Sequence, residues 1–164
     1  MEVQQLMTRG VRTVGTGDPM NRAAQIMWES DCGVVPVVDG DGKVTSLITD
    51  RDICMAAYMQ GKTLAEMPVS LAASRTVVSV RDHDDISSAE QLMQQHQIRR
   101  VPVVDANGLL CGMLSLADIA RSSHLSGKTG EGLGHQDVAK TVAAISQPRR
   151  HEETQGSGAG RHAA

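Results

Sequence analysis

Aromatic side chains are almost missing from the sequence. Phenylalanine is absent, and Trp28 and Tyr58 are the only aromatic residues among 164. Proteins that bind single-stranded RNA or DNA stack bases on several aromatic rings, which this chain cannot supply. The formal net charge of −3 gives no overall attraction to a phosphate backbone either. We therefore expect no nucleic-acid partner.

Long apolar runs and paired cysteines are also absent. No stretch approaches the roughly 18 apolar residues of a membrane-spanning helix, and the N-terminal residues lack the pattern of a signal peptide. Cys32, Cys54 and Cys111 are odd in number and form no CxxC pair, which argues against a disulfide framework or a structural zinc site. We expect them to be small apolar residues, with Cys54 on the buried side of a helix. The prediction is a cytoplasmic protein with no membrane segment and no metal.

The chain contains an internal duplication. A shift of 66 residues aligns Val34–Asp39 with Arg100–Asp105 without a gap, and 16 of the 51 pairs between residues 3–53 and 69–119 are identical. Unrelated sequences of average composition would share about one pair in sixteen. The duplication predicts two similar lobes that face each other, related by a pseudo-twofold axis.

Each copy has the pattern strand, helix, strand, strand, helix, which predicts an α/β (α+β) fold with a small three-stranded sheet and two helices per copy. In the first copy the strands are residues 11–14, 34–38 and 44–48, and the closing helix is 50–60; the matching helix of the second copy is 116–124. Asp18 is predicted to cap the first helix with Pro19 at its first position, and Asp84 repeats that cap. Gly61 is a natural end for the closing helix.

The duplication also sets the predicted domain boundaries. Residues 1–62 are the first repeat and residues 63–125 the second. Residues 126–146 are predicted to be a linker and a short helix that docks on the body or on a second subunit, because Val138, Val142 and Ile145 share one helical face. Residues 147–164 are polar, so burial cannot repay the entropy of ordering them, and a flexible tail is predicted.

A hydroxyl residue followed three positions later by Asp recurs at the start of both closing helices. The pairs are Thr49 with Asp52 and Ser115 with Asp118. One interpretation is a capping box, in which each side chain bonds the other's backbone amide. The other is a ligand site, because a helix N-terminus favours phosphate and a carboxylate can accept both hydrogens of a ribose diol. Gly112, three residues before Ser115, would let a flat base approach the backbone.

No catalytic constellation stands out. Residues 126–129 look like the end of a phosphate-binding P-loop, but the first glycine of that motif would fall at Ser122, and a helix precedes it where a strand is required. The six histidines lack the spacing of metal ligands, and no cysteine is paired with a base in a recognisable pattern. We expect no enzymatic activity.

The doubled pattern resembles the paired cystathionine-β-synthase (CBS) domain, or Bateman module. The resemblance covers residues 3–124 and rests on the apolar-x-apolar-Pro run before each hairpin and the hydroxyl-x-x-Asp after it. It implies a stand-alone regulatory protein that binds an adenosine-containing ligand, such as AMP, ADP, ATP, NAD or S-adenosylmethionine, in clefts between the two CBS repeats. It also implies a homodimer that acts through an unknown effector protein. The alternative is a dimeric interaction scaffold without a ligand, in which the hydroxyl-Asp pairs are only caps.

The resemblance also implies roles for individual residues. The hydroxyl of each pair would contact phosphate or ribose, and the Asp would hold the ribose hydroxyls. The other implied ligand contacts are basic residues before the strand proline, valines around the adenine and hydroxyls of the first strand: Arg99 and Arg100, Val35 and Val101, and Thr13 and Ser79. The first copy has Gly33 and Val34 in place of the two arginines, and Ser46 in place of Gly112. We therefore rank the cleft of the second copy, with Gly112, Ser115, Asp118 and Arg100, above the cleft with Thr49 and Asp52.

Overall fold

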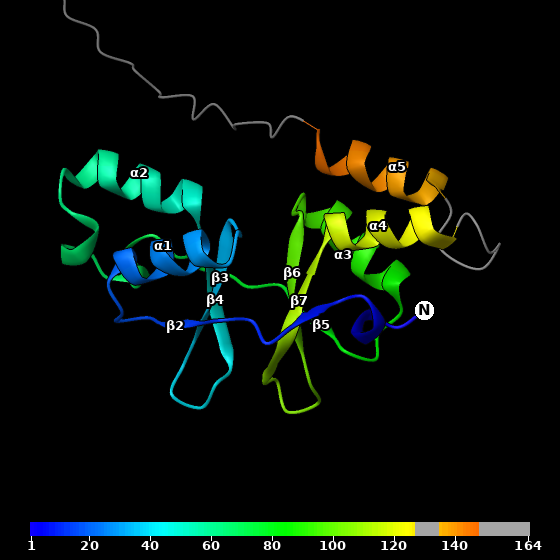
Figure 1. Ribbon diagram of the computed structural model, residues 1–164, viewed down its shortest axis with the longest axis horizontal. Coiled ribbons are helices and arrows are strands. Elements are labelled where there is room, and N and C mark those ends of the chain that lie inside the picture. Colours follow the sequence, from blue (N-terminus) through cyan, green and yellow to red (C-terminus); the bar gives the residue numbers. More distant parts are fainter. Residues whose placement is uncertain (127–134, 148–164) are drawn as a thin grey trace, which may run out of the picture.

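The computed structural model describes residues 1–126 and 135–147, which form two lobes side by side (Figure 1). The first lobe contains β2 (Val14–Gly15), α1 (Met20–Glu29), β3 (Val34–Val38), β4 (Val44–Thr49) and α2 (Asp50–Gln60). The second lobe contains β5 (Val80–Arg81), α3 (Ile86–His96), β6 (Arg100–Val104), β7 (Leu110–Ser115) and α4 (Leu116–Ser126), followed by α5 (His135–Ile145). The predicted α/β fold and the pattern of each repeat are confirmed.

The two sheets differ by one strand. In the first sheet β3 lies between β2, which is parallel to it, and β4, which is antiparallel. The second sheet repeats this arrangement with β5, β6 and β7 and adds β1 (Thr8–Arg9) antiparallel to the outer side of β7. Thr8 lies opposite Met113 and Arg9 opposite Gly112. This fourth strand is not predicted by the sequence pattern, which gives three strands per repeat.

The segment before each repeat packs into the other lobe. The 3-10 helix η1 (Val3–Gln5) places Val3 in the core of the second lobe, whereas η3 (Val69–Leu71), which follows η2 (Leu64–Glu66), places Val69 in the core of the first. The bonds are equivalent under the 66-residue shift. The Val3 N–H donates to the Asp84 carbonyl at 2.9 Å, and the Val69 N–H donates to the Asp18 carbonyl at 2.8 Å. Each repeat is therefore preceded by a segment that completes the core of the other lobe.

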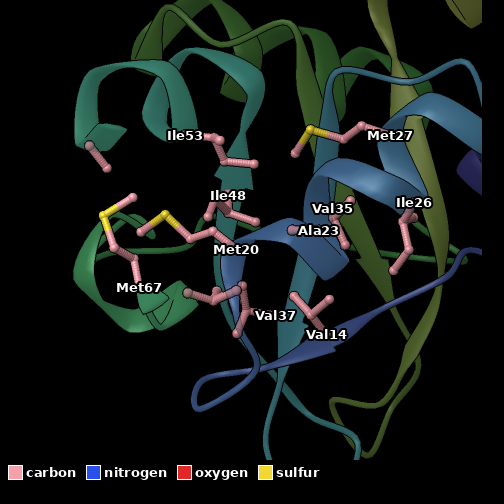
Figure 2. Close-up of a cluster of buried hydrophobic side chains, with 12 residues drawn as sticks. Val14, Met20, Ala23, Ile26, Met27, Val35, Val37, Ile48, Ile53 and Met67 are labelled. Carbon is pink, nitrogen blue, oxygen red and sulfur yellow. The ribbon is translucent and has the colours of Figure 1, made fainter. Parts of the chain in front are cut away.

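The core of the first lobe is built from aliphatic and methionine side chains, since the chain has no phenylalanine (Figure 2). Met20, Ala23 and Met27 of α1 are buried at the predicted helical spacing against Val35 and Val37 of β3 and other members of the cluster. The equivalent stripe of α3, which consists of Ile86, Ala89 and Met93, is buried in the second lobe. Each lobe thus has its own continuous apolar core.

The predicted helix caps are wrong at the start of α1 and α3. Pro19, in an extended conformation, is the N-cap of α1, and the Asp18 carboxylate instead accepts the Gly15 N–H at 2.8 Å. In the second repeat Asp84 likewise accepts the Arg81 N–H at 2.8 Å, and the neighbouring Asp85 caps α3. Both carboxylates that recur in the duplication therefore close the turn after β2 or β5. The predicted end of α2 at Gly61 is confirmed, since Gly61 is left-handed with φ of 61°.

Helix α5 docks on the second lobe, where it packs on α3 and α4 (Figure 1). Thr141 and Ile145 are buried and Val138 is partly buried, but Val142 is exposed, so the predicted stripe is only partly correct. The linker 127–134 and most of the predicted tail, residues 148–164, lie outside the described residues. Cys54, predicted on the buried side of its helix, is exposed.

Candidate functional site

The first hydroxyl-Asp pair forms a capping box at the start of α2. The Thr49 N–H and Oγ1 donate to Asp52 Oδ2 at 2.9 and 2.7 Å, and the Asp52 N–H donates back to Thr49 Oγ1 at 3.2 Å. Both bonds that the carboxylate accepts end on the same oxygen, Oδ2. The other, Asp52 Oδ1, accepts no hydrogen bond from the described residues. The capping function therefore leaves half of this carboxylate available to a ligand.

The second pair forms the same box, but its carboxylate is saturated. Ser115 N–H and Oγ donate to Asp118 Oδ2 at 2.8 and 2.5 Å, and the Asp118 N–H donates to Ser115 Oγ at 3.2 Å. The Arg121 guanidinium also binds Asp118 Oδ1, and the Asp118 side chain is only 10% exposed. In the first repeat Met55 takes the position of Arg121 and cannot donate. The sequence ranks the cleft with Asp118 above the cleft with Asp52. Among the described residues, however, Asp52 has a carboxylate oxygen without a partner and Asp118 does not.

A pocket of about 540 Å³ lies between the repeats. It is lined by residues from the end of α1 and the start of α2, together with one residue of the second repeat: Met27, Trp28, Asp31, Cys32, Gly33, Asp50 and Arg100. Arg100 is exposed and makes no side-chain hydrogen bond or ion pair with the described residues. A guanidinium of one repeat therefore faces the helix start of the other. Among the predicted site residues, Arg100 alone lines this pocket.

The space beside Gly112 is filled by the chain itself. A Cβ atom at this position would lie 2.5 Å from the Thr8 carbonyl oxygen and 3.0 Å from Met7 Sδ. The close backbone approach that a glycine permits is therefore made by β1, and not by a flat base as the sequence suggested. Ser46, the equivalent residue of the first repeat, is buried in β4.

The remaining predicted site residues are spread over the molecule. Val35 and Val101 are fully buried in the two cores. Thr13 is half-buried and Arg99 is exposed, and neither lines the pocket between the repeats. Ser79 lines a different cavity, of about 610 Å³, beside the β6–β7 turn. Their contacts with a ligand stay predictions.

Several residues that line the pocket were missed by the sequence analysis. Trp28 and Asp31 lie at the end of α1 and the turn after it, outside every motif of the duplication. Gly33 packs against Asp50, since a Cβ at Gly33 would lie 2.9 Å from Asp50 Oδ2. A lone tryptophan on a polar helix face was the one signal in the sequence for this part of the site.

Comparison with known proteins assigns the family. The family model for the CBS domain matches residues 3–58 and again residues 69–124. The CBS domain-containing protein YhcV of Bacillus subtilis is 36% identical over 139 residues, which cover 83% of this chain and 97% of that protein. The chain belongs to the CBS-domain family, with two CBS domains in tandem.

Two solved structures extend the comparison. The crystal structure of Hypoxic Response Protein I with two coordinated zinc ions aligns with a TM-score of 0.67 and 31% identity, covering 74% of this chain and 98% of that one. The CBS domain pair of protein MJ0100, in complex with 5′-methylthioadenosine and S-adenosyl-L-methionine, aligns with a TM-score of 0.67 and 25% identity, covering 78% and 98%. The pairing of two CBS repeats in this chain is thus that of known CBS-domain pairs.

Within the residues that the structure describes, no three His, Cys, Asp or Glu side chains are grouped so as to hold a metal ion. In the same residues no helix combines the length and the apolar character needed to cross a membrane.

Proposed function

We propose that this protein is a regulatory module that binds an adenosine-containing ligand in the pocket between its repeats and catalyses no reaction. The observation that carries the proposal is Arg100, a guanidinium that has no side-chain partner among the described residues and faces the start of α2 across this pocket. The relative MJ0100 was crystallised with two adenosine compounds, which supports this class of ligand. We also propose a cytoplasmic homodimer that acts through a separate effector protein.

The charge of the pocket favours ligands with little negative charge. One arginine, Arg100, stands with two carboxylates, Asp31 and Asp50, so the lining residues carry a formal charge of 1 − 2 = −1. The two carboxylates would repel a triphosphate at close range, whereas they would not repel an uncharged thioether or a cationic sulfonium. We propose 5′-methylthioadenosine or S-adenosylmethionine as the preferred ligand, AMP as a weaker one, and ATP as the weakest.

We propose Asp52 as the carboxylate for the ribose hydroxyls; it does not itself line the pocket, but it lies two residues after Asp50, which does. Asp52 Oδ1 accepts no hydrogen bond from the part of the chain that the structure describes, whereas both oxygens of Asp118 are bound within the chain. The variants Asp52→Asn and Asp118→Asn are a matched pair, because they weaken equivalent capping boxes. We expect only Asp52→Asn to weaken ligand binding.

Trp28 makes a direct test possible, because it is the single tryptophan of the chain and lines the pocket. Titration with each adenosine compound should change its fluorescence, and a ligand at a hundred times its dissociation constant should stabilise the fold by about 2.7 kcal/mol. Arg100→Ala should weaken AMP binding, whereas Arg99→Ala, which alters an adjacent exposed arginine outside the pocket, should not. If no compound changes either the fluorescence or the midpoint of unfolding, the scaffold alternative is correct.

The scaffold alternative has an observation of its own in its favour. Both hydroxyl-Asp pairs serve as complete capping boxes, and the Asp118 carboxylate has no unpaired oxygen. A protein that kept these pairs only to start two helices would have this geometry. The matched Asp→Asn variants separate the two functions, because a scaffold would lose stability in both and would bind no ligand in either.

A further inference from the structure

A second cavity lies at the end of the second sheet that is remote from the pocket between the repeats. Its volume is about 610 Å³, within the usual range for small-molecule sites. Strands β5 and β6 are parallel, and their last residues, Arg81 and Val104, both line it, whereas Arg100 of the other pocket begins β6. Figure 1 shows the β6–β7 turn, which adjoins this cavity, at the opposite end of the strands from α4. Since ligands often bind beyond the carboxyl ends of parallel strands, this position suits a separate site.

The cavity brings one guanidinium together with two carboxylates, those of Arg81, Asp84 and Asp105. Arg81 is exposed, and its side chain makes no hydrogen bond or ion pair with the described residues. Asp84 Oδ2 accepts the Arg81 N–H at 2.8 Å, and Asp105 Oδ1 accepts the Asn107 and Leu109 N–H groups at 2.8 and 2.9 Å. Within the same part of the chain, neither carboxylate pairs with a cation. The backbone therefore holds both carboxylates in place without neutralising their charge.

The first repeat shows which partner Asp84 lacks. Under the 66-residue shift Asp18 is its equivalent, and both carboxylates close the turn after the first strand of their repeat. Asp18 also pairs with Arg22 of α1, whose Nη1 lies 3.2 Å from Asp18 Oδ2. Ser88 stands in place of Arg22 in the second repeat and carries no charge. The same carboxylate thus has a cationic partner in one repeat and none from the described residues in the other.

A small ligand can supply both missing partners at once. Arg81 stands where the first repeat has Gly15, so the second repeat adds a guanidinium beside the carboxylate that lost its cation. A ligand that completes these ion pairs needs a cation for Asp84 and an anion for Arg81. An α-amino acid carries an ammonium and a carboxylate on the same carbon. A guanidinium binds a carboxylate through two parallel hydrogen bonds, and an ammonium group can donate three.

We propose that this cavity binds a free α-amino acid, with its carboxylate at Arg81 and its ammonium at Asp84. Basic amino acids are preferred, because the lining residues carry a formal charge of 1 − 2 = −1 and Asp105 offers a second carboxylate to a cationic side chain. The site is distinct from the pocket between the repeats, and the proposal does not depend on adenosine binding there.

Titration of the isotope-labelled full chain with L-lysine, followed by two-dimensional NMR, tests the proposal. The amide signal of Gly108, which lines the cavity, should shift, whereas the indole N–H signal of Trp28, which lines the other pocket, should not. We expect a dissociation constant of about 1 mM or below. Glycine betaine, a zwitterion without N–H donors, and L-glutamate, whose net charge is negative, should each bind at least about tenfold more weakly.

Two variants remove one charge each from the cavity, and a third is their control. Arg81→Gln and Asp105→Asn should both weaken L-lysine binding about tenfold. Asparagine at 105 can keep the turn, because its carbonyl oxygen accepts the same backbone N–H groups. Asp39→Asn is the matched control: Asp39 is the equivalent of Asp105, and its Oδ1 accepts the Asp41 and Lys43 N–H groups at 3.0 and 2.9 Å. This variant should bind L-lysine as wild type does.

Three results would overturn the proposal: no shift of the Gly108 signal at about 10 mM L-lysine, binding that survives both Arg81→Gln and Asp105→Asn, or an equal loss in Asp39→Asn. A shift of Trp28 in place of Gly108 would put the amino acid in the other pocket and refute the assignment as well. Unchanged signals from the rest of the chain show that each variant is folded. Adenosine compounds should shift Trp28 and not Gly108, so the failure of either binding proposal is recognised independently of the other.

Discussion

Gly112→Ala should destabilise the protein through β1, the strand that it contacts. The alanine Cβ would lie 2.5 Å from the Thr8 carbonyl oxygen, a distance that real Cβ atoms do not tolerate, and 3.0 Å from Met7 Sδ. A methionine side chain can rotate away, but a backbone carbonyl cannot. The only relief is a shift of β1 away from β7, which strains the pairing of Arg9 with Gly112.

The expected cost is about 1–3 kcal/mol, as for other overpacked sites. The upper half of that range applies, because Met7 directly precedes β1 and is buried, like the earlier Val3, in the core of the second lobe. A domain with a stability of about 5–15 kcal/mol remains folded after such a loss. Urea unfolding without ligand should therefore show a lower midpoint with an unchanged dependence on denaturant.

Two controls separate the strand contact from other effects. Ser46→Ala changes the equivalent residue of the first repeat and should alter stability by less than about 1 kcal/mol. The double variant Met7→Ala/Gly112→Ala should lose less stability than the two single variants lose together, because Met7→Ala removes one of the two clashes. If Gly112→Ala unfolds at the wild-type midpoint and instead weakens ligand binding, the strand explanation is refuted and the glycine serves the base as first suggested.

Three further predictions concern buried groups. Burial, together with the nearby carboxylates of Asp137 and Asp85, raises the pKa of Glu90 above its ordinary 4.5. The folded chain therefore binds this proton more tightly than the unfolded chain does. The free energy of unfolding should then fall as the pH rises from 4.5 through the raised pKa. Urea unfolding across this pH range should show the fall in the wild type and a smaller fall in Glu90→Gln. Equal pH profiles for the two proteins would contradict the prediction. Thr141→Val should cost about 1–3 kcal/mol by leaving the amide of Gln94 and the carboxylate of Glu90 without their partner, and a neutral result in the same assay would disprove that role. Met20→Ala should lower the free energy of unfolding by about 2–5 kcal/mol because Met20 is fully buried. Calorimetry should show a lower melting temperature for this variant. An unchanged melting temperature would mean that the core collapses around the cavity.

The fold was largely predictable because the duplication supplies each signal twice. The Val-rich strand with its proline and the stripe around Met20 recur at the same spacing, and both copies fold as that spacing predicts. Strand β1 could not be predicted, because two residues carry no periodicity and its partner β7 lies about a hundred positions later in the chain. The same holds for Asp18, whose side chain suits a helix cap and a turn equally well, so that only the conformation of Pro19 decides between them.

The local geometry of the two hydroxyl-Asp pairs was predictable from the sequence. A hydroxyl and an Asp three residues apart are enough to predict a capping box, and both boxes form. The contact of Arg121 with Asp118 follows from their three-residue spacing on one helix, a signal that is present in the sequence. The pocket is lined by Trp28 of the first lobe and Arg100 of the second. A sequence pattern within one repeat cannot predict that residues of two lobes lie close together.

The exchanged segments have a consequence for the history and the handling of the protein. Val3 completes one core and Val69 completes the other, so neither half of the gene encodes a globule that is complete by itself. Before the duplication, a single unit of this kind would have needed a twin to lend it the missing segment. Either half expressed alone should accordingly form an intertwined dimer or an aggregate. Two separate halves would complete each other's cores only at sufficient concentration, whereas one polypeptide holds both segments at every concentration.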